Sequence, residues 1–370
     1  MKRPIYIFSS GELKRKDNTI FFENEQGKKY IPVENTGEIY IFGEVDINKR
    51  FLEFATQAEI IIHFFNHYEY YVGSYYPREH LNSGYMILKQ AEHYLDPQKR
   101  QKIAAEFVMG AVKNIGNVIR YYSNRGKNLK HIEDRIKEIE DKIYSARDIE
   151  ELMALEGNTR EHYYKAFDII LNNPDFVFEQ RTRRPPQNNL NTLISFGNSL
   201  IYAIVLSEIY KTHLDPRIGF LHATNFRRFT LNLDVAEVFK PIIVDRVIFT
   251  LIGRNMISKE DFEKSTNGLV LSERGQQVFI SEMENKLKST FKHRNLGRNV
   301  SYRRLIRLEL YKLSKHLIGE QEYKAYVAKW CIKSRRPPIV QKPLEVDDFF
   351  VLLGVAQIAC ISTEMWYNKI

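Results

Sequence analysis

Four side chains in the middle of the chain are of types that bind divalent metal ions: Glu156, His222, Asp234 and Glu237. A spacing of three residues places Asp234 and Glu237 on one face of a predicted helix, beside apolar neighbours. Two acids in such surroundings repel each other unless a cation neutralises them. Carboxylate oxygens suit Mg²⁺ and Mn²⁺, and an added imidazole favours Mn²⁺ without excluding Mg²⁺.

Each of these residues also has an ordinary structural interpretation. Glu156 follows Leu155 and is expected at the edge of a buried helix face, where surface glutamates are common. His222 lies between apolar residues and suits a hydrogen-bonded core histidine as well as a metal ligand or an acid–base group. The Asp234 and Glu237 pair suits an acidic first helical turn, with Asp234 near the N-cap. Because Glu156 and His222 are far apart in sequence, spacing alone leaves the metal site open.

The chain is basic, and its positive charge is concentrated near the end. Its net charge is +9, yet residues 286–336 contain fifteen Lys and Arg against three Glu, a net +12. This stretch predicts a polyanion-binding surface, although a solvated helix face is the alternative. A second basic cluster precedes Pro185 and Pro186. A solvated loop would explain this second cluster equally well. The arginines predicted to contact phosphate groups of a polyanion are Arg181, Arg183, Arg184, Arg294, Arg303 and Arg307.

Composition excludes several classes of protein. The two cysteines, Cys331 and Cys360, provide neither a disulfide framework nor a thiolate zinc site. The N-terminal apolar run is too short for a signal peptide. The longest apolar stretch, residues 349–361, is shorter than the roughly 18 residues that a membrane span needs. We therefore expect a soluble cytoplasmic protein with no membrane partner.

The metal-binding candidates must be positioned by a helical domain that follows a strand-rich one. Short β-branched and aromatic runs separated by polar turns predict a small all-β unit; the expected strands are 5–8, 19–22, 30–33, 38–42, 60–64 and 68–72. The dense aromatics of residues 64–76 suit a core or a dimer interface better than base stacking. Beyond a boundary near 77–90 the apolar period becomes helical, with helices expected over 103–119, 131–146, 193–210, 234–252 and 272–289.

Ordered motifs along residues 3–330 resemble one family, the CRISPR-associated integrase/endonuclease of the spacer-acquisition (adaptation) module. The most specific are Leu214-Asp215-Pro216 with Gly219-Phe220-Leu221-His222, then 231–241, and Val244-Asp245-Arg246. Others are 6–13, 15–19, 42–45, 73–79, 183–186 and 191–196. Each piece is weak alone, whereas the ordered set is a strong signal.

The resemblance implies an α+β protein. A small N-terminal β-sandwich-like domain, residues 1–85, would dimerise, and a larger all-α domain, residues 86–336, would bind DNA and carry catalysis. It implies a homodimer joined by a smaller CRISPR-associated adaptation partner. This complex would take double-stranded and branched DNA and insert short fragments into the CRISPR array, with a DNA 3′-hydroxyl attacking a phosphodiester at the repeat border.

The resemblance also assigns the site residues. Glu156, His222 and Glu237 would be the ligands of Mn²⁺ or Mg²⁺, and Asp234 an outer-shell group or proton acceptor. The third ligand is often Asp in the family and is Glu here. Residues from about 331 on match nothing in the family, and a subtype extension, a partner contact and disorder are the alternative interpretations of the tail, residues 337–370. A non-catalytic DNA-binding scaffold and a purely structural dimerisation protein are the alternative functions.

Overall fold

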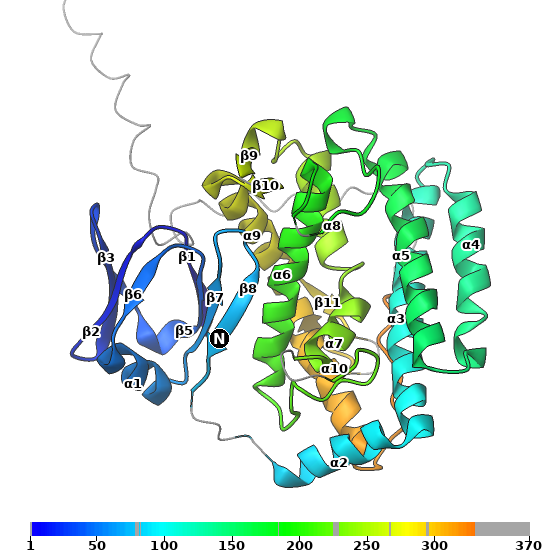
Figure 1. Cartoon of the computed structure of the whole chain (residues 1–370), viewed down its shortest axis with the longest axis horizontal. Coiled ribbons are helices and arrows are strands. Elements are labelled where there is room, and N and C mark those ends of the chain that lie inside the picture. The colour runs from blue at the N-terminus through cyan, green and yellow to red at the C-terminus, as the bar shows by residue number, and fades with distance from the viewer. Residues whose placement is uncertain are drawn as a thin grey trace, which may run out of the picture. The chain divides into compact units, whose positions relative to one another are not determined.

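The structure is a computed structural model of the chain, and it describes residues 2–77, 81, 83–183, 185–224, 229–265, 268–293 and 296–329. The chain divides into two compact units, described over residues 2–77 and 81–329. The first is rich in strands and the second is mainly helical (Figure 1). The expected α+β class, with strands before helices, is confirmed. The expected boundary at residue 85 lies one residue inside the first helix of the second unit.

The first unit contains two four-stranded sheets. One has the order β1-β5-β7-β8, in which β1, β5 and β7 are parallel and β8 is antiparallel to β7. The other has the order β4-β3-β2-β6, an antiparallel meander with β6 added parallel to β2. The strands are β1 Arg3–Ile7, β2 Gly11–Lys16, β3 Thr19–Asn24, β4 Gly27–Ile31, β5 Thr36–Ile41, β6 Val45–Ile47, β7 Ile61–Phe65 and β8 Tyr71–Tyr75.

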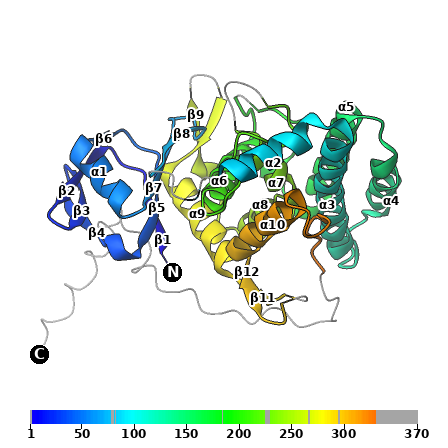
Figure 2. The same ribbon diagram turned by 90° about the horizontal axis from the view of Figure 1, so that it is seen from below.

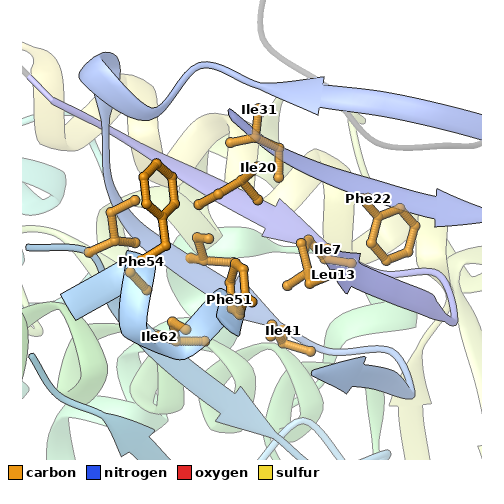
Figure 3. Close-up of a cluster of buried hydrophobic side chains, with 12 residues drawn as sticks. Ile7, Leu13, Ile20, Phe22, Ile31, Ile41, Phe51, Phe54 and Ile62 are labelled. Carbon is orange, nitrogen blue, oxygen red and sulfur yellow. The ribbon is translucent and has the colours of Figure 1, made fainter. Parts of the chain in front are cut away.

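A shared apolar core joins the two sheets, as expected of a sandwich. Ile7, Ile39 and Ile62 from one sheet and Leu13 and Phe22 from the other belong to one buried cluster (Figure 3). The expectation of an all-β unit is wrong in one respect, because helix α1, Lys49–Gln57, closes this core. Its N-cap, Asn48, accepts a hydrogen bond from the Phe51 amide, and Phe51, Phe54 and Ala55 on its inner face are buried.

The second unit is built around the long helix α3, which packs against α2, α4, α5 and α7. The last helix, α10, packs against α2, α6, α7 and α9 (Figure 2). The α-helices are α2 Gly84–Leu95, α3 Pro97–Ser123, α4 Lys130–Glu140, α5 Ile149–Leu171, α6 Asn189–Ile209, α7 Leu231–Phe239, α8 Val244–Gly253, α9 Glu273–Lys288 and α10 Tyr302–Leu317. The short 3-10 helices are η1 Val33–Asn35 in the first unit, then η2 Ile143–Ser145, η3 Pro174–Phe176 and η4 Lys259–Asp261.

Two features of this unit differ from the expected helices. The helix predicted over 234–252 is two helices, α7 and α8, which are separated at Lys240–Ile243; Pro241 lies in this break and has no amide proton to donate. Two hairpins interrupt the expected all-helical domain. They are β9 Phe262–Ser265 with β10 Gly268–Leu271, and β11 Thr290–Lys292 with β12 Asn299–Ser301.

Helix α6 is long and apolar enough to cross a membrane by length and composition alone. Within the unit, however, 83% of its apolar window is buried, as in the core helix of a soluble protein. The tail 337–370 lies outside the described residues, as do Cys331 and Cys360.

Candidate active site

Helix α5 positions Glu156. The helix begins after Asp148, whose carboxylate accepts a hydrogen bond from the Glu151 amide at 2.8 Å. Asp148 is thus the N-cap of the helix. The Glu151 carboxylate accepts a hydrogen bond from the amide of Arg147, rather than from that of Asp148 as in a capping box. Glu156 lies further along the helix at the edge of its buried face, and the Arg160 Nε one turn on donates to Glu156 Oε1 at 3.1 Å.

Arg160 links this helix to α7. Its Nη2 donates to Glu237 Oε2 at 2.6 Å, so the two predicted metal-ligand carboxylates, 156 and 237, share one buried guanidinium. The other oxygen of Glu237 accepts from the Lys240 ammonium at 2.5 Å, and that ammonium also donates to the hydroxyl of Tyr202 at 2.6 Å. Arg160 therefore compensates the charges of both Glu156 and Glu237, and Lys240 that of Glu237.

Asp234 holds His222 in place. The carboxylate is fully buried and accepts hydrogen bonds from the backbone amides of Phe220, Leu221 and His222 at 2.5, 3.0 and 3.0 Å. Its Oδ1 also lies 2.7 Å from His222 Nδ1. An ionised carboxylate can only accept, so Nδ1 carries the proton and Nε2 is left as the acceptor or ligand atom of the ring.

The loop that carries His222 is fixed by several helices. The Gln90 amide of α2 bonds the backbone of Asp215 in both directions, and the Arg100 Nε of α3 donates to the Phe220 carbonyl at 2.9 Å. Gly219 is required by a close approach, because a Cβ at this position would lie 2.8 Å from Asp234 Oδ2 and from the Thr230 backbone. The Gly-Phe-Leu-His motif is thus the sequence of a loop wrapped around one carboxylate.

These contacts shift the pKa values of the two glutamates of the site in opposite directions. Burial would raise the pKa of Glu237, but Lys240 and Arg160 lower it to about 2. Burial and the charge of Glu237 raise the pKa of Glu156. Burial would lower the pKa of His222, yet the hydrogen bond and charge of Asp234 outweigh it and raise that pKa. The site therefore holds one firmly ionised acid beside one that is easily neutralised.

The donor set fits a divalent ion by its chemistry. Two carboxylates and an imidazole with a fixed tautomer are suitable ligands for Mn²⁺ or Mg²⁺. In the part of the chain that the structure describes, however, no three His, Cys, Asp or Glu side chains come together closely enough to hold one ion. Arg160 brings Glu156 and Glu237 together. His222 instead contacts Asp234, which lies on α7 as Glu237 does. The ligand set stays a prediction.

The predicted DNA-binding arginines are in different surroundings. Arg181 is half-buried and fastens its loop to α6 through Asn191 Oδ1 and Ser195 Oγ. Arg303 Nη2 donates to Glu284 Oε1 at 2.8 Å, and Arg307 Nε donates to Glu208 Oε2 at 2.6 Å. Arg183 is exposed. Arg184 and Arg294 lie outside the described residues. DNA contact by these arginines stays a prediction.

Sequence reasoning missed three residues of the site: Arg160, Lys240 and Tyr202. Two of them had a detectable signal, since Arg160 is four residues after Glu156 and Lys240 three after Glu237, which are spacings at which helical side chains pair. Tyr202 had none, because it reaches Lys240 from a different helix.

Comparison with known proteins decides the family. The sequence profile described as "CRISPR associated protein Cas1" matches residues 5–285. The chain belongs to the Cas1 family. CRISPR-associated endonuclease Cas1 2 of Thermodesulfovibrio yellowstonii is 62% identical over 330 residues, which is 89% of this chain and all of that protein. CRISPR-associated endonuclease Cas1 of Thermotoga maritima is 52% identical over 319 residues, 86% of this chain and 98% of that protein.

Solved structures agree with this assignment. The Cas1 protein of Thermotoga maritima aligns with a TM-score of 0.80 at 50% identity, covering 88% of this chain and all of that one. A casposase bound to integration product has a TM-score of 0.79 at 19% identity, covering 88% of this chain and 93% of that chain. A chain of a Cas6-RT-Cas1–Cas2 complex has a TM-score of 0.79 at 16% identity, and the alignment covers 89% of this chain and 36% of that chain. At these last two identities the likeness is one of fold alone.

Proposed function

We propose that this Cas1-family protein is a divalent-metal-dependent DNA endonuclease and integrase of spacer acquisition. It would insert short DNA fragments into the CRISPR array through attack of a DNA 3′-hydroxyl on a phosphodiester at the repeat border. The observation that carries the proposal is that the buried Arg160 of α5 binds both Glu156 and Glu237, and that α7, which carries Glu237, also fixes His222 through Asp234. The relatives named as endonucleases support it.

Glu156, His222 and Glu237 would hold the ion. Bound Mn²⁺ or Mg²⁺ would polarise a phosphoryl oxygen, help to activate a water or 3′-hydroxyl, and offset charge on the leaving oxygen. Asp234 holds the proton of the neutral His222 ring on Nδ1, which leaves Nε2 as the ligand atom of that ring. Arg160 and Lys240 keep Glu237 ionised, since both lower its pKa. Lys240 is itself oriented by Tyr202.

Three variants test this site: Glu156→Ala, His222→Ala and Glu237→Gln. The glutamine is chosen because alanine at 237 would leave Arg160 and Lys240 buried without their carboxylate, which costs about 3–5 kcal/mol. We expect each variant to fold and to bind DNA, but to lose at least about 100-fold in Mn²⁺-dependent cleavage and strand transfer. Glu161→Gln, an exposed acid of the same helix paired with Lys165, is the matched control. Full activity in folded Glu237→Gln protein would overturn the site.

The competing function is a DNA-binding scaffold without catalysis. It is tested on the unmodified protein by titrating Mn²⁺ and Mg²⁺ against a branched DNA substrate. Metal-dependent cleavage or joining is the expected result. DNA binding without any metal-dependent product would support the scaffold instead.

We further propose that the protein acts in the cytoplasm as a homodimer, joined by a smaller adaptation partner. The Cas1–Cas2 composition of a fold neighbour supports a partner. Sedimentation of the purified chain, alone and with a Cas2 protein, tests both statements: a monomer at micromolar concentration would contradict the dimer, and absence of a heavier complex would contradict the partner.

A further inference from the structure

The buried arginine of the candidate active site, Arg160, uses only part of its guanidinium. Its Nε and Nη2 donate to Glu156 and Glu237, but its Nη1 is buried and has no hydrogen-bond partner among the described residues. A buried donor without a partner is costly, so this atom calls for an explanation. A carboxylate on a neighbouring helix supplies one.

That carboxylate belongs to Asp245, in the first turn of α8. Its Oδ2 lies 3.9 Å from Arg160 Nη1, and it too is buried and accepts no hydrogen bond from the described residues. Helices α5 and α8 pack against each other (Figure 1), and the ring centres of Phe167 and Phe249 lie 4.6 Å apart between them. The Asp245 amide donates to the Lys240 carbonyl at 3.0 Å. A donor and an acceptor of opposite charge therefore stop about 1 Å short of a hydrogen bond.

Two ordinary explanations exist for Asp245. An acid in the first turn of a helix stabilises the helix dipole, and a buried water molecule would complete both unpaired atoms. Glu150, in the first turn of α5, shows the usual form of the dipole contact, because it is exposed, whereas Asp245 is only 2% exposed. Neither explanation predicts that Asp245 affects the binding of a metal ion.

A metal ion would compete with Arg160 for its carboxylates. The guanidinium donates to both Glu156 and Glu237, and Lys240 occupies the second oxygen of Glu237. A divalent ion on these two acids is repelled by the buried cation already bonded to them, so Arg160 must give up at least one of its bonds. A buried arginine needs a carboxylate partner, and a shift of about 1 Å brings Asp245 into hydrogen-bond range.

We propose that Arg160 takes the place of the metal ion in the metal-free protein, and that Asp245 is the carboxylate to which Arg160 turns when the ion binds. Asp245 is thus a positioning residue, which acts through Arg160 and lowers the cost of freeing Glu156 and Glu237. The inference rests on the proposed function for the set of metal ligands, but not for the reaction.

The test measures the affinity of the full chain for Mn²⁺ alone, without DNA, from the electron paramagnetic resonance signal of the free ion at pH 7.5. Loss of binding in Glu156→Ala identifies the ion that belongs to this site. We expect Asp245→Asn to weaken that binding about tenfold, as is usual for a residue that supports a metal ligand. Asp245→Glu keeps the charge on a longer side chain and should bind at least as tightly as the unmodified protein. Glu161→Gln, which removes an exposed charge of α5 paired with Lys165, is the control.

A second pair of variants shows whether the effect of Asp245 passes through Arg160. Arg160→Gln removes the cation that the ion displaces, so it should bind Mn²⁺ more tightly, and adding Asp245→Asn should then leave the affinity unchanged. If Asp245 attracts the ion only by its charge, Asp245→Asn weakens binding equally in both backgrounds and the proposal is refuted. Circular dichroism shows whether each variant is folded. If Arg160→Gln does not fold, the comparison of Asp245→Asn with Asp245→Glu decides.

The outcomes separate this role of Asp245 from the proposed function. If Asp245→Asn binds Mn²⁺ as tightly as Glu161→Gln does, or if the unmodified protein binds none, the role is refuted, even when the unmodified protein joins DNA. If Asp245→Asn weakens binding only while Arg160 is present, and the unmodified protein neither cuts nor joins DNA with Mn²⁺, the role is supported and the proposed function fails.

Discussion

At the scale of single residues, Asp234 has the clearest task. One buried carboxylate accepts three backbone amides and the imidazole of His222, so its charge orders a whole loop. An amide in its place would offer one oxygen to these donors and would turn its own N–H groups towards others. Asp234 therefore positions His222, which favours the outer-shell role over that of a proton acceptor.

We predict that Asp234→Asn lowers strand-transfer activity about 10–100-fold, as is usual when the group that orients a metal-binding histidine is lost. The same change should lower the pKa of His222 in the metal-free protein, because the hydrogen bond and charge that raise it disappear while burial remains. Titration of the His222 ring signals by NMR measures this shift. An unchanged His222 pKa in a folded variant would contradict the positioning role.

Asp245 gives a prediction for the dependence of stability on pH. Burial raises its pKa from 3.8 to about 6, against the opposing charge of Arg160. Because the folded state holds the proton more tightly than the unfolded state, this group's contribution is fully present below pH 4 and is lost as the pH rises through about 6. The side chain of the Asp245→Asn variant cannot ionise, so this variant does not lose that contribution to the free energy of unfolding, which amounts to roughly 3 kcal/mol.

Urea unfolding of Asp245→Asn and of the unmodified protein at pH 4, 5, 6 and 7 measures the effect. The free energy of unfolding of the variant, relative to the unmodified protein, should increase over this range. Asp134→Asn, an exposed acid paired with Lys130, should show no such increase. A difference that is constant with pH would mean that Asp245 is ionised throughout.

At the scale of elements, helix α7 is linked through α3 to an irregular segment, residues 322–329, which we call the strap. Asn114 of α3 is fully buried and joins the two: its Nδ2 donates to the carbonyls of Val238 and Tyr326 at 2.9 and 3.0 Å, and its Oδ1 accepts from the Ala328 amide at 2.8 Å. Val238 lies next to Glu237, so this contact supports the helix that carries the site.

We predict that Asn114→Ala lowers the free energy of unfolding by about 3 kcal/mol, because three buried backbone groups lose their partner. Asn117→Ala, which removes a single bond to the Ala328 carbonyl, should cost about 1 kcal/mol and is the control. Gly110→Ala should destabilise the same contact, since its Cβ would lie 2.5 Å from that of Ala325. Urea unfolding measures all three, and equal effects of Asn114→Ala and Asn117→Ala would exclude the linking role.

The sequence predicted the elements better than the contacts between them. Apolar spacing located α3 and α6, because the signal of a helical period is local. Helix α1 was missed because its nine residues are too few to show a sustained helical period between the predicted strands. Pro241 divides α7 from α8, although the apolar period continues across the break.

The candidate site was predicted residue by residue from ordered motifs, but its internal pairing was not. Arg160 reaches Glu237 across 77 residues of sequence, and no local pattern predicts which of several acids a buried arginine will meet. The same limitation applies to the basic segment 286–336, because a count of its charges does not show which of its cations form ion pairs with acids elsewhere in the chain. Arg307, for example, pairs with Glu208, 99 residues away, on α6.

At the scale of the whole molecule, these ion pairs change what the net charge of +9 means for DNA binding. Six cations of the basic segment 286–336 pair with described carboxylates: Lys288, Arg303, Arg307, Lys312, Lys315 and Lys324. Lys292 and Arg298, at the β11–β12 hairpin, are exposed and pair with no described carboxylate. Free cations release DNA counterions on binding, whereas paired ones must first leave their carboxylates.

Two double variants with the same charge change separate these groups. We predict that Lys292→Gln with Arg298→Gln lowers the affinity for duplex DNA and reduces its salt slope by about 1.8, which is two phosphate contacts. Arg303→Gln with Arg307→Gln should reduce the slope less and should destabilise the fold, because Glu284 and Glu208 then stay buried with weaker compensation. Fluorescence anisotropy at several salt concentrations and urea unfolding measure the two effects. If the slope falls equally in both variants, Arg303 and Arg307 contact DNA as the sequence predicted, and their ion pairs open when DNA binds.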